Sequence, residues 1–175
     1  MLRTSTLLAA ALLVTACGAD DSADPAGGEQ LPALGIRNLS KPLPNILCSG
    51  QPTEEQFDKL ERAGVTHVLH LRTKGEKGTG WEEARASRAD VLFERLEIAG
   101  ADGLTRENVE AFAEKLAACK GGTVLVSCGS SNRVGAMFAL KAAWLDGASK
   151  EEAMALGQRA GMTRLASKVE ALLDG

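Results

Sequence analysis

The stretch Cys128-Gly129-Ser130-Ser131-Asn132-Arg133 decides how the rest of the chain is interpreted. It follows an apolar run, Val124 to Val126, which predicts a short buried strand, and it precedes an apolar segment of helical length, Val134 to Leu145. A tight loop between a strand and a helix points backbone N–H groups inward, and the helix N-terminus adds partial positive charge. The sequence therefore predicts a loop that holds an oxyanion or a thiolate, called the cradle loop below.

Two side chains give the cradle loop its expected chemistry. Cys128 lies where the positive field is strongest, so its thiolate form is favoured and can act as a nucleophile. The planar guanidinium of Arg133 can bind two oxygens of an anion, while the backbone of Gly129 to Asn132 supplies N–H donors. The simpler alternative is that Cys128 is a small buried hydrophobic residue, as cysteines at strand ends usually are.

Outside the cradle loop, short apolar runs alternate with segments of helical character. Strands are expected near residues 46–48, 65–71, 91–96 and 123–127, and helices near 53–63, 81–89, 105–121 and 134–145, with two more after Ser149 that Gly161 separates. Capping boxes begin at Thr53 and Ser149. The pattern predicts a three-layer α/β sandwich whose central, largely parallel sheet has about four to five strands. Ligands of such sheets bind beyond the carboxyl ends of the strands, where Cys128 falls.

Two further segments carry a family resemblance. Ser49-Gly50-Gln51-Pro52-Thr53 and Asn132-Arg133-Val134-Gly135-Ala136, taken with the cradle loop, resemble the phosphatase-like domain of the beta-lactamase hydrolase-like family, a branch of the protein tyrosine phosphatase superfamily. The resemblance covers residues 38 to 173. It implies a tyrosine-phosphatase-like fold and hydrolysis of a phosphoester through a cysteinyl-phosphate intermediate. A small anionic substrate or a phosphorylated protein would be the partner.

The resemblance also assigns a role to Asp102, in the segment between the third expected strand and the following helix. By its position upstream of Cys128, Asp102 would be the general acid that protonates the leaving group. The alternative is a turn residue whose carboxylate binds its own backbone.

The cradle loop departs from the phosphatase pattern in length and at three positions. Four residues separate Cys128 from Arg133, a spacing that resembles the rhodanese loop, whereas the tyrosine phosphatase loop is usually one residue longer. Ser127 stands where related loops often have His, Ser131 where Gly is common, and Val134 where a hydroxyl is usual. Ser131 matters most, because Ser tolerates positive φ less readily than Gly. Two alternatives therefore stay open: a sulfurtransferase that works through a Cys persulfide, and a catalytically inactive anion-binding domain.

The histidines and the remaining cysteines give no metal motif. His67 and His70 lie three apart on a strand, hence on opposite faces, so no metal and no cofactor are predicted. His70 either reaches the cradle loop or is a hydrogen-bonded structural residue. Cys48 and Cys119 could pair with each other, or one of them could be a resolving thiol for Cys128.

The N-terminus predicts export. Residues 1–17 have Arg3, an apolar run too short to span a bilayer, and a lipobox-like end at Cys17, which indicates a lipoprotein signal peptide and a lipidated Cys17. The expected location is the bacterial cell envelope, facing the periplasm, with contact to the membrane through the lipid alone. Gly18, rather than Asp, resembles the sorting signal for the outer membrane. An ordinary secretory signal is the alternative.

Composition limits the remaining possibilities. Residues 18–38 are rich in Asp, Gly, Pro and Ala and predict a flexible acidic linker, which leaves residues 39–175 as a phosphatase-like domain. The chain of 175 residues, with 45% hydrophobic and 25% charged residues, is enough for one such domain. A net charge of -3 and the absence of Tyr argue against a nucleic-acid partner, and the sequence does not indicate an oligomeric state.

Overall fold

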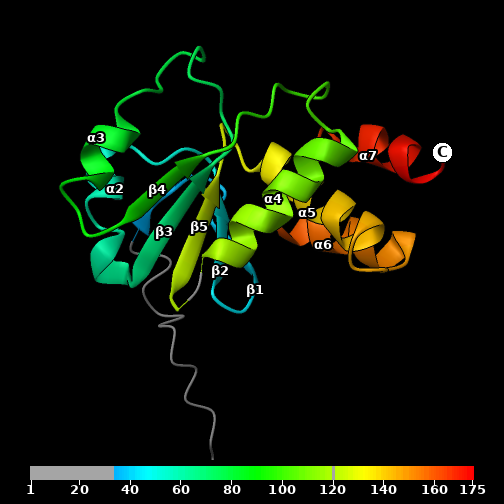
Figure 1. Ribbon diagram of the computed structural model, residues 1–175, viewed down its shortest axis with the longest axis horizontal. Helices are drawn as coiled ribbons and strands as arrows, with labels where there is room; N and C mark the ends of the chain where they lie inside the picture. The colour runs from blue at the N-terminus through cyan, green and yellow to red at the C-terminus, as the bar shows by residue number, and fades with distance from the viewer. Residues whose placement is uncertain (1–33, 120) are drawn as a thin grey trace, which may run out of the picture.

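A five-stranded sheet lies between two layers of helices in the computed structural model, which describes residues 34–119 and 121–175 (Figure 1). The strands are β1 (Ser40–Leu43), β2 (Ile46–Ser49), β3 (Val65–His70), β4 (Leu92–Arg95) and β5 (Thr123–Ser127). Their order is β1-β2-β5-β3-β4, and β1 pairs antiparallel with β2 while the other neighbours are parallel. The predicted three-layer sandwich with a largely parallel central sheet is confirmed.

The two helical layers cover opposite faces of the sheet. On one side lie α2 (Glu54–Phe57), the 3-10 helix η1 (Glu61–Ala63) and α3 (Glu82–Ala86); on the other lie α4 (Arg106–Ala118), α5 (Asn132–Trp144), α6 (Lys150–Arg159) and α7 (Ala166–Leu173) (Figure 1). Successive residues of a strand face opposite sides, so Val124 and Val126 of β5 pack with α4 and α5, whereas Leu125 packs towards α2 and η1. The alternation explains why β5 reads as an uninterrupted apolar run.

Capping motifs account for where α2, α4 and α6 begin. The capping boxes at Thr53 and Ser149 are present, and the Thr105 side chain accepts the backbone N–H of Asn108 at the start of α4. The helix expected over 53–63 is shorter, because α2 ends at Phe57 and the chain continues in turns to η1. Phe57 and Leu60 are both buried, and the tight turn between them directs both side chains into the core.

β1 is a strand that the sequence pattern does not predict. This strand contains Pro42, which lacks a donor for the sheet ladder, and it lies at the edge of the sheet where such a residue is tolerated. The predicted linker also needs a correction at its end. Leu34 and Ile36 are buried at 4% and 5% exposure in the cluster around α2 and η1, so residues 34–38 pack against the domain. Their apolar side chains outweigh the polar composition of the preceding segment.

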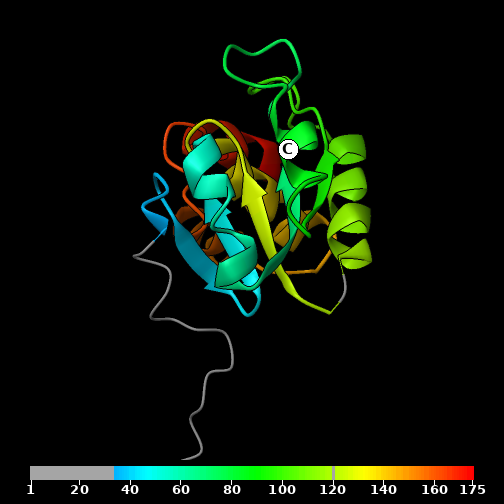
Figure 2. The same ribbon diagram turned by 90° about the vertical axis from the view of Figure 1, so that its left-hand side faces the viewer.

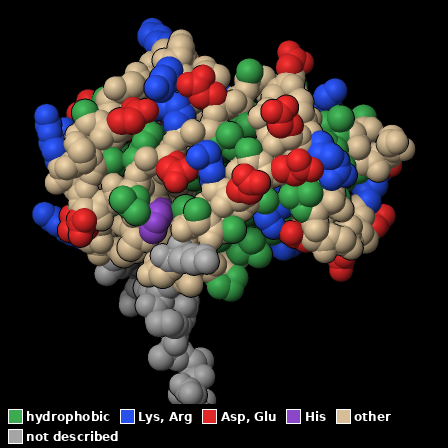
Figure 3. Space-filling view, in the orientation of Figure 1, with side chains coloured by type: hydrophobic (Ala, Val, Ile, Leu, Met, Phe, Trp, Pro, Cys, Tyr) green, Lys and Arg blue, Asp and Glu red, His purple; other side chains and the backbone are tan. Residues whose placement is uncertain are grey.

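The signal peptide, Cys17 and the rest of the linker lie outside the described residues. Within the described part of the chain, no helix is both long and apolar enough to cross a bilayer. Acidic and basic side chains are interspersed over the face of the molecule in Figure 3, in keeping with the small net charge.

The strand ends determine where the candidate site lies. β2, β3 and β5 run in parallel, with Ser49 and His70 both in register with Ser127. The segments that follow these strands therefore meet at one edge of the sheet. Of these, the segment between β3 and α3 projects furthest beyond this edge (Figure 2). The cradle loop emerges at the same edge.

Candidate active site

The cradle loop joins the end of β5 to the start of α5. The backbone N–H of Cys128 donates to the carbonyl of Ser49 at 3.2 Å, and Ser130 forms an isolated antiparallel bridge with Gly50. These contacts place the Ser49-to-Thr53 segment beside the cradle loop. Cys128 is 1% exposed, and it lines a cavity of about 610 Å³ together with Gly129, Ser130, Asn132 and Arg133. The structure thus brings together five of the predicted site residues, and the sixth residue of the loop, Ser131, is buried behind them.

Arg133 is held by a carboxylate that the sequence analysis did not identify. Its Nη1 and Nη2 atoms donate to Oε1 and Oε2 of Glu76, each at 2.7 Å, and Nη1 also donates to the carbonyl of Ile98 at 2.7 Å. Glu76 lies in the segment between β3 and α3 and lines the same cavity. The side chain of Arg133 is only 13% exposed. A paired, mostly buried guanidinium has a fixed orientation relative to Cys128.

Glu76 is itself surrounded by donors. Its carboxylate accepts hydrogen bonds from Nε of Arg72 and from the backbone N–H of Thr73, both at 2.9 Å. The hydrogen bonds from Arg133 and then from Arg72 lower the pKa of Glu76 from 4.5 to about 2, against the opposing effect of burial. Glu76 is therefore ionised at neutral pH and keeps Arg133 charged. Burial alone would lower the pKa of Arg133, but Glu76 and the nearby Cys128 raise it.

Gln51, from the Ser49-to-Thr53 segment, connects this pair to the helix α3. The Gln51 amide oxygen accepts a hydrogen bond from Nη1 of Arg72, and its Nε2 donates to Oε1 of Glu82 at 2.7 Å. Glu82 is 1% exposed and also pairs with Arg95 at 3.1 Å. The guanidinium of Arg72 is therefore used inside this network, where it contacts both Glu76 and Gln51.

Ser131 adopts the left-handed conformation that the sequence analysis expected to be unfavourable for Ser, with φ of 63°. Its hydroxyl donates to the carbonyl of Ala160 at 2.8 Å, and the residue is completely buried. A Cβ on Gly161 would lie 2.6 Å from the Cβ of Ser131, so a glycine is required there. The Ser131 side chain fits here because Gly161, in the loop between α6 and α7, has no side chain to occupy the same space.

Asn132 ties the loop between α6 and α7 to the cradle loop. Its Oδ1 accepts the backbone N–H of Thr163 at 2.8 Å and that of Leu165 at 3.3 Å. Asn132 is only 9% exposed, so its side chain serves this internal contact while its backbone belongs to the first turn of α5.

Asp102 lies near the cavity without lining it. Ala99 and Gly100 of the same loop are lining residues, but Asp102 is exposed and makes no hydrogen bond with another residue in the described part of the chain. Neither the general-acid role nor the turn alternative is tested by this arrangement. The role of Asp102 stays a prediction.

His70 occupies a structural position below the cradle loop. Its Nδ1 and the hydroxyl of Ser127 are 2.8 Å apart, and its Nε2 lies 3.6 Å from Oε1 of Glu82. Burial, followed by the charges of Arg95, Arg72 and Arg133, lowers the pKa of His70 from 6.5 to about 3. His70 is therefore neutral at physiological pH.

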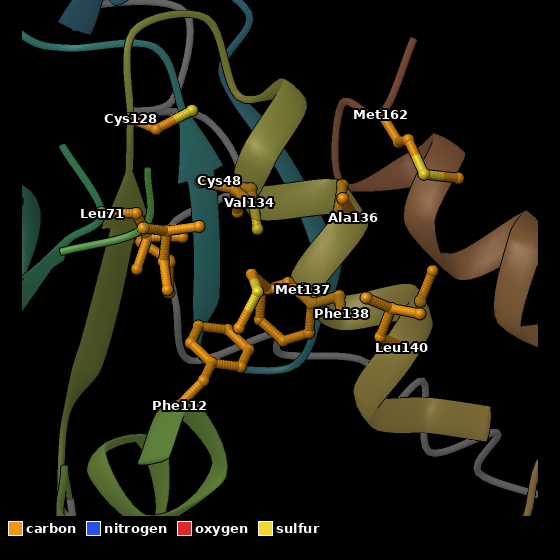
Figure 4. Packing of buried hydrophobic residues seen from close by; sticks show 14 of the residues in the cluster. Cys48, Leu71, Phe112, Cys128, Val134, Ala136, Met137, Phe138, Leu140 and Met162 are labelled. Carbon is orange, nitrogen blue, oxygen red and sulfur yellow. The ribbon is translucent and has the colours of Figure 1, made fainter. Parts of the chain in front are cut away.

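The described cysteines are free thiols. Cys48 is buried in the same cluster as Cys128 and Val134, beneath the start of α5 (Figure 4). Burial, and next the charge of Cys128, raise the pKa of Cys48 above its usual range. Cys119 lies at the far end of α4, where its Sγ donates to the carbonyl of Lys115. The pairing of Cys48 with Cys119 is not present in this structure.

Among residues 34–119 and 121–175, no group of three or more His, Cys, Asp or Glu side chains is arranged to hold a metal ion.

Known proteins resemble the chain in sequence and in fold. No family model matches the chain. The beta-lactamase hydrolase-like protein of Xylella fastidiosa is 33% identical to the chain over 121 residues, in both of two strains. The match covers 66% of this chain and 27% of the relative, so the chain spans about a quarter of the length of the curated proteins that it resembles.

Solved structures agree on the fold. A candidate phosphatase of the DUF442 group from Shewanella putrefaciens CN-32 superimposes with a TM-score of 0.63 and 27% identity, over 83% of this chain and 92% of that one. TpbA of P. aeruginosa, solved in complex with phosphotyrosine, superimposes with a TM-score of 0.60 and 24% identity, over 80% and 90% of the two chains. The resemblance to the beta-lactamase hydrolase-like family and to tyrosine-phosphatase-like proteins is confirmed.

Proposed function

We propose that this chain hydrolyses phosphomonoesters with Cys128 as the nucleophile. The tyrosine-phosphatase-like fold, and the phosphatases among the solved structures that share it, support this proposal. The Cys128 thiolate attacks phosphorus, an S–P bond forms, and the P–O bond to the leaving alcohol breaks. Asp102 donates the proton that the departing alkoxide requires. Water then attacks the cysteinyl phosphate, the S–P bond breaks, and inorganic phosphate and the thiolate are released.

The cradle loop would stabilise the charge on the transferring phosphoryl group. The first backbone N–H groups of α5, a helix of 13 residues, face the loop and have no partner within the helix. Two of the five N–H bonds of the Arg133 guanidinium remain as donors, because Glu76 accepts two and the carbonyl of Ile98 accepts a third. These donors are available to the equatorial phosphoryl oxygens.

One observation carries the proposal: Arg133 is already oriented by Glu76 in the cavity that Cys128 lines. An anion-binding loop needs such preorganisation, whereas a buried structural cysteine does not. Asp102 lies on a loop whose neighbouring residues line the cavity, so a local movement of that loop would bring its carboxyl group to the leaving oxygen.

Intact-mass measurement tests the proposal. The full chain is exposed to a slowly hydrolysed aryl phosphate, with Cys128→Ser as the control. A phosphoryl adduct that depends on Cys128 is the expected result, together with release of the aryl alcohol. Equal turnover by wild type and Cys128→Ser would refute the nucleophile.

The four-residue spacing between Cys128 and Arg133 favours a second candidate, a rhodanese-like sulfurtransferase. In that reaction, the Cys128 thiolate takes the outer sulfur of thiosulfate to form a persulfide, and sulfite leaves. Exposure to thiosulfate in the same mass experiment would then add one sulfur atom. Asp102→Asn separates the two reactions, because it should slow aryl phosphate hydrolysis and leave persulfide formation unchanged.

We also propose that the protein is a lipoprotein of the bacterial cell envelope, attached through Cys17. The lipobox-like sequence before Cys17 supports this location. Metabolic labelling with a fatty acid should mark the wild-type chain and fail to mark Cys17→Ser.

A further inference from the structure

Two arginines line the cavity without any role in the proposed reaction. Arg37 and Arg164 are both exposed, and both contribute to the cavity that contains Cys128 and Arg133. Neither guanidinium has a hydrogen-bond or ion-pair partner among residues 34–119 and 121–175. Their charges are therefore available to a ligand.

The backbone of Arg37 is fixed directly against the cradle loop. Its carbonyl accepts the N–H of Gly50 at 2.7 Å, and the side chain of the next residue, Asn38, donates to the carbonyl of Ser130 at 2.9 Å. A Cβ on Gly50 would lie 3.0 Å from the carbonyl oxygen of Arg37 and 3.2 Å from that of Gly129. Gly50 thus permits a close approach that sets Arg37 beside the loop.

Arg164 is fixed by a different residue of the loop. Oδ1 of Asn132 accepts the N–H groups of Thr163 and Leu165, which flank Arg164 on both sides. Two arginines from distant parts of the chain are therefore held at the cavity by hydrogen bonds to Ser130 and to Asn132. These backbone hydrogen bonds distinguish Arg37 and Arg164 from an ordinary surface arginine, whose position does not depend on a binding loop.

No acidic side chain that lines the described cavity is free to pair with these two arginines. Glu76 is the one acidic residue among those that line the described cavity, and its carboxylate is already occupied by Arg133 and Arg72. No aromatic side chain is among these lining residues, and the aliphatic side chains among them are those of Ala99 and Leu165. The cavity thus offers a second positive region next to the phosphoryl site but no ring on which an aromatic leaving group could stack.

We infer that Arg37 and Arg164 form a second anion subsite, and that the substrate is a small, non-aromatic molecule with at least two phosphoryl groups. One phosphoryl group reaches Cys128, and another is bound by the two guanidinium groups. The identity of the reacting group rests on the proposed function. The subsite itself is a binding property and does not depend on turnover.

Binding to the full-length Cys128→Ser protein tests the subsite apart from catalysis. Calorimetric titration compares orthophosphate, which fills one anion site, with tripolyphosphate, which can span two. We expect tripolyphosphate to bind at least about tenfold more tightly, the equivalent of one charge-assisted hydrogen bond. Adding Arg37→Ala and Arg164→Ala should remove most of that advantage and leave orthophosphate affinity nearly unchanged.

Arg88→Ala is the matched control, since Arg88 is also exposed and lies outside the cavity lining. It should preserve the advantage of tripolyphosphate, which excludes a general effect of net charge. The inference is overturned if the Arg37 and Arg164 variants bind tripolyphosphate as tightly as the Arg88 variant does. It is also overturned if they weaken only the binding of an acidic phosphopeptide, because the partner would then be a protein.

Turnover by the wild type distinguishes failure of the subsite from failure of the proposed function. Fructose 1,6-bisphosphate and fructose 6-phosphate form a matched pair, and we expect a higher kcat/KM for the bisphosphate that falls to the monophosphate value in the double arginine variant. If neither compound nor an aryl phosphate is hydrolysed but the calorimetric difference holds, the proposed function fails and the subsite stands. Equal kcat/KM for the two sugars, in an active enzyme, would refute the substrate class.

Discussion

Glu76→Gln is the perturbation that best probes the candidate site, because it removes the charge that orients Arg133 and keeps the shape of the side chain. In the structure, Glu76 accepts two hydrogen bonds from Arg133 and one from Arg72. Gln can replace only part of this, since its amide nitrogen would face guanidinium donors. We expect a loss of stability and, if the proposed function holds, a loss of phosphatase activity.

The size of the stability loss follows from the pKa of Glu76. A fall from 4.5 in the free side chain to about 2 in the folded protein corresponds to about 3 kcal/mol by linkage. The side chain of Glu76 is 30% exposed, so solvent screening reduces the expected change in the free energy of unfolding to about 2 kcal/mol. Because the folded pKa is the lower one, this contribution is complete above pH 4.5 and is lost as the pH falls towards 2.

Urea unfolding at pH 7 and at pH 3.5 measures the loss. The difference between wild type and Glu76→Gln should be about 2 kcal/mol at pH 7 and clearly smaller at pH 3.5. Glu114→Gln is the control, since Glu114 is exposed on α4, and it should change stability by less than about 0.5 kcal/mol. A Glu76→Gln protein as stable as the control at pH 7, with unchanged kcat/KM on aryl phosphate, would refute the assigned role of Glu76.

Three further predictions concern the support of the cradle loop. Gly161→Ala should destabilise by about 3 kcal/mol or more, since its Cβ would meet Ser131, whereas Gly147→Ala, also at positive φ but in open space, should cost only about 1 kcal/mol; a urea denaturation series compares them, and equal losses would contradict the packing argument. His70 has a pKa of about 3 when folded, so the free energy of unfolding should fall by up to about 1.4 kcal/mol per pH unit as the pH drops below 6.5; the wild-type slope should be reduced in His70→Asn, and an unchanged slope would exclude His70 as its source. Gly50→Ala should push Arg37 and Gly129 apart and weaken phosphate binding in the Cys128→Ser background, and calorimetry would contradict this by finding equal affinity.

Hydrophobic periodicity and local motifs were sufficient to predict the strand and the helix on either side of the cradle loop. The apolar run at β5 and the helix after Arg133 were predictable because their buried residues are close in sequence, and the capping boxes at Thr53 and Ser149 depend on residues three apart. β1 was not predictable in this way, because its pairing partner and not its own composition makes it a strand.

The carboxylates of the site were not predictable from the sequence. Glu76 sits in a segment rich in Lys and Gly, which has the composition of a solvated loop, yet its partner Arg133 lies 57 residues away. Glu82 begins a short helix next to Glu83, and nothing local indicates that only Glu82 is buried. The Gln51 side chain that reaches Glu82 gave the one available signal, since it belongs to the segment that carried the family resemblance.

The two serines that depart from the phosphatase pattern illustrate why a single position in such a loop is a poor guide to its geometry. Ser127 takes the place of a common His, but His70 on the adjacent strand lies in register with it and shares a hydrogen bond of 2.8 Å. Ser131 takes the place of a common Gly and keeps the left-handed conformation, which costs about 1 kcal/mol or more for a non-glycine residue. Its hydrogen bond to Ala160 offsets that cost, and position 161 is a glycine, where a Cβ would clash with Ser131. Each serine is therefore accommodated by a residue elsewhere in the chain, His70 for Ser127 and Gly161 for Ser131, and a pattern confined to the loop itself cannot reveal these partners.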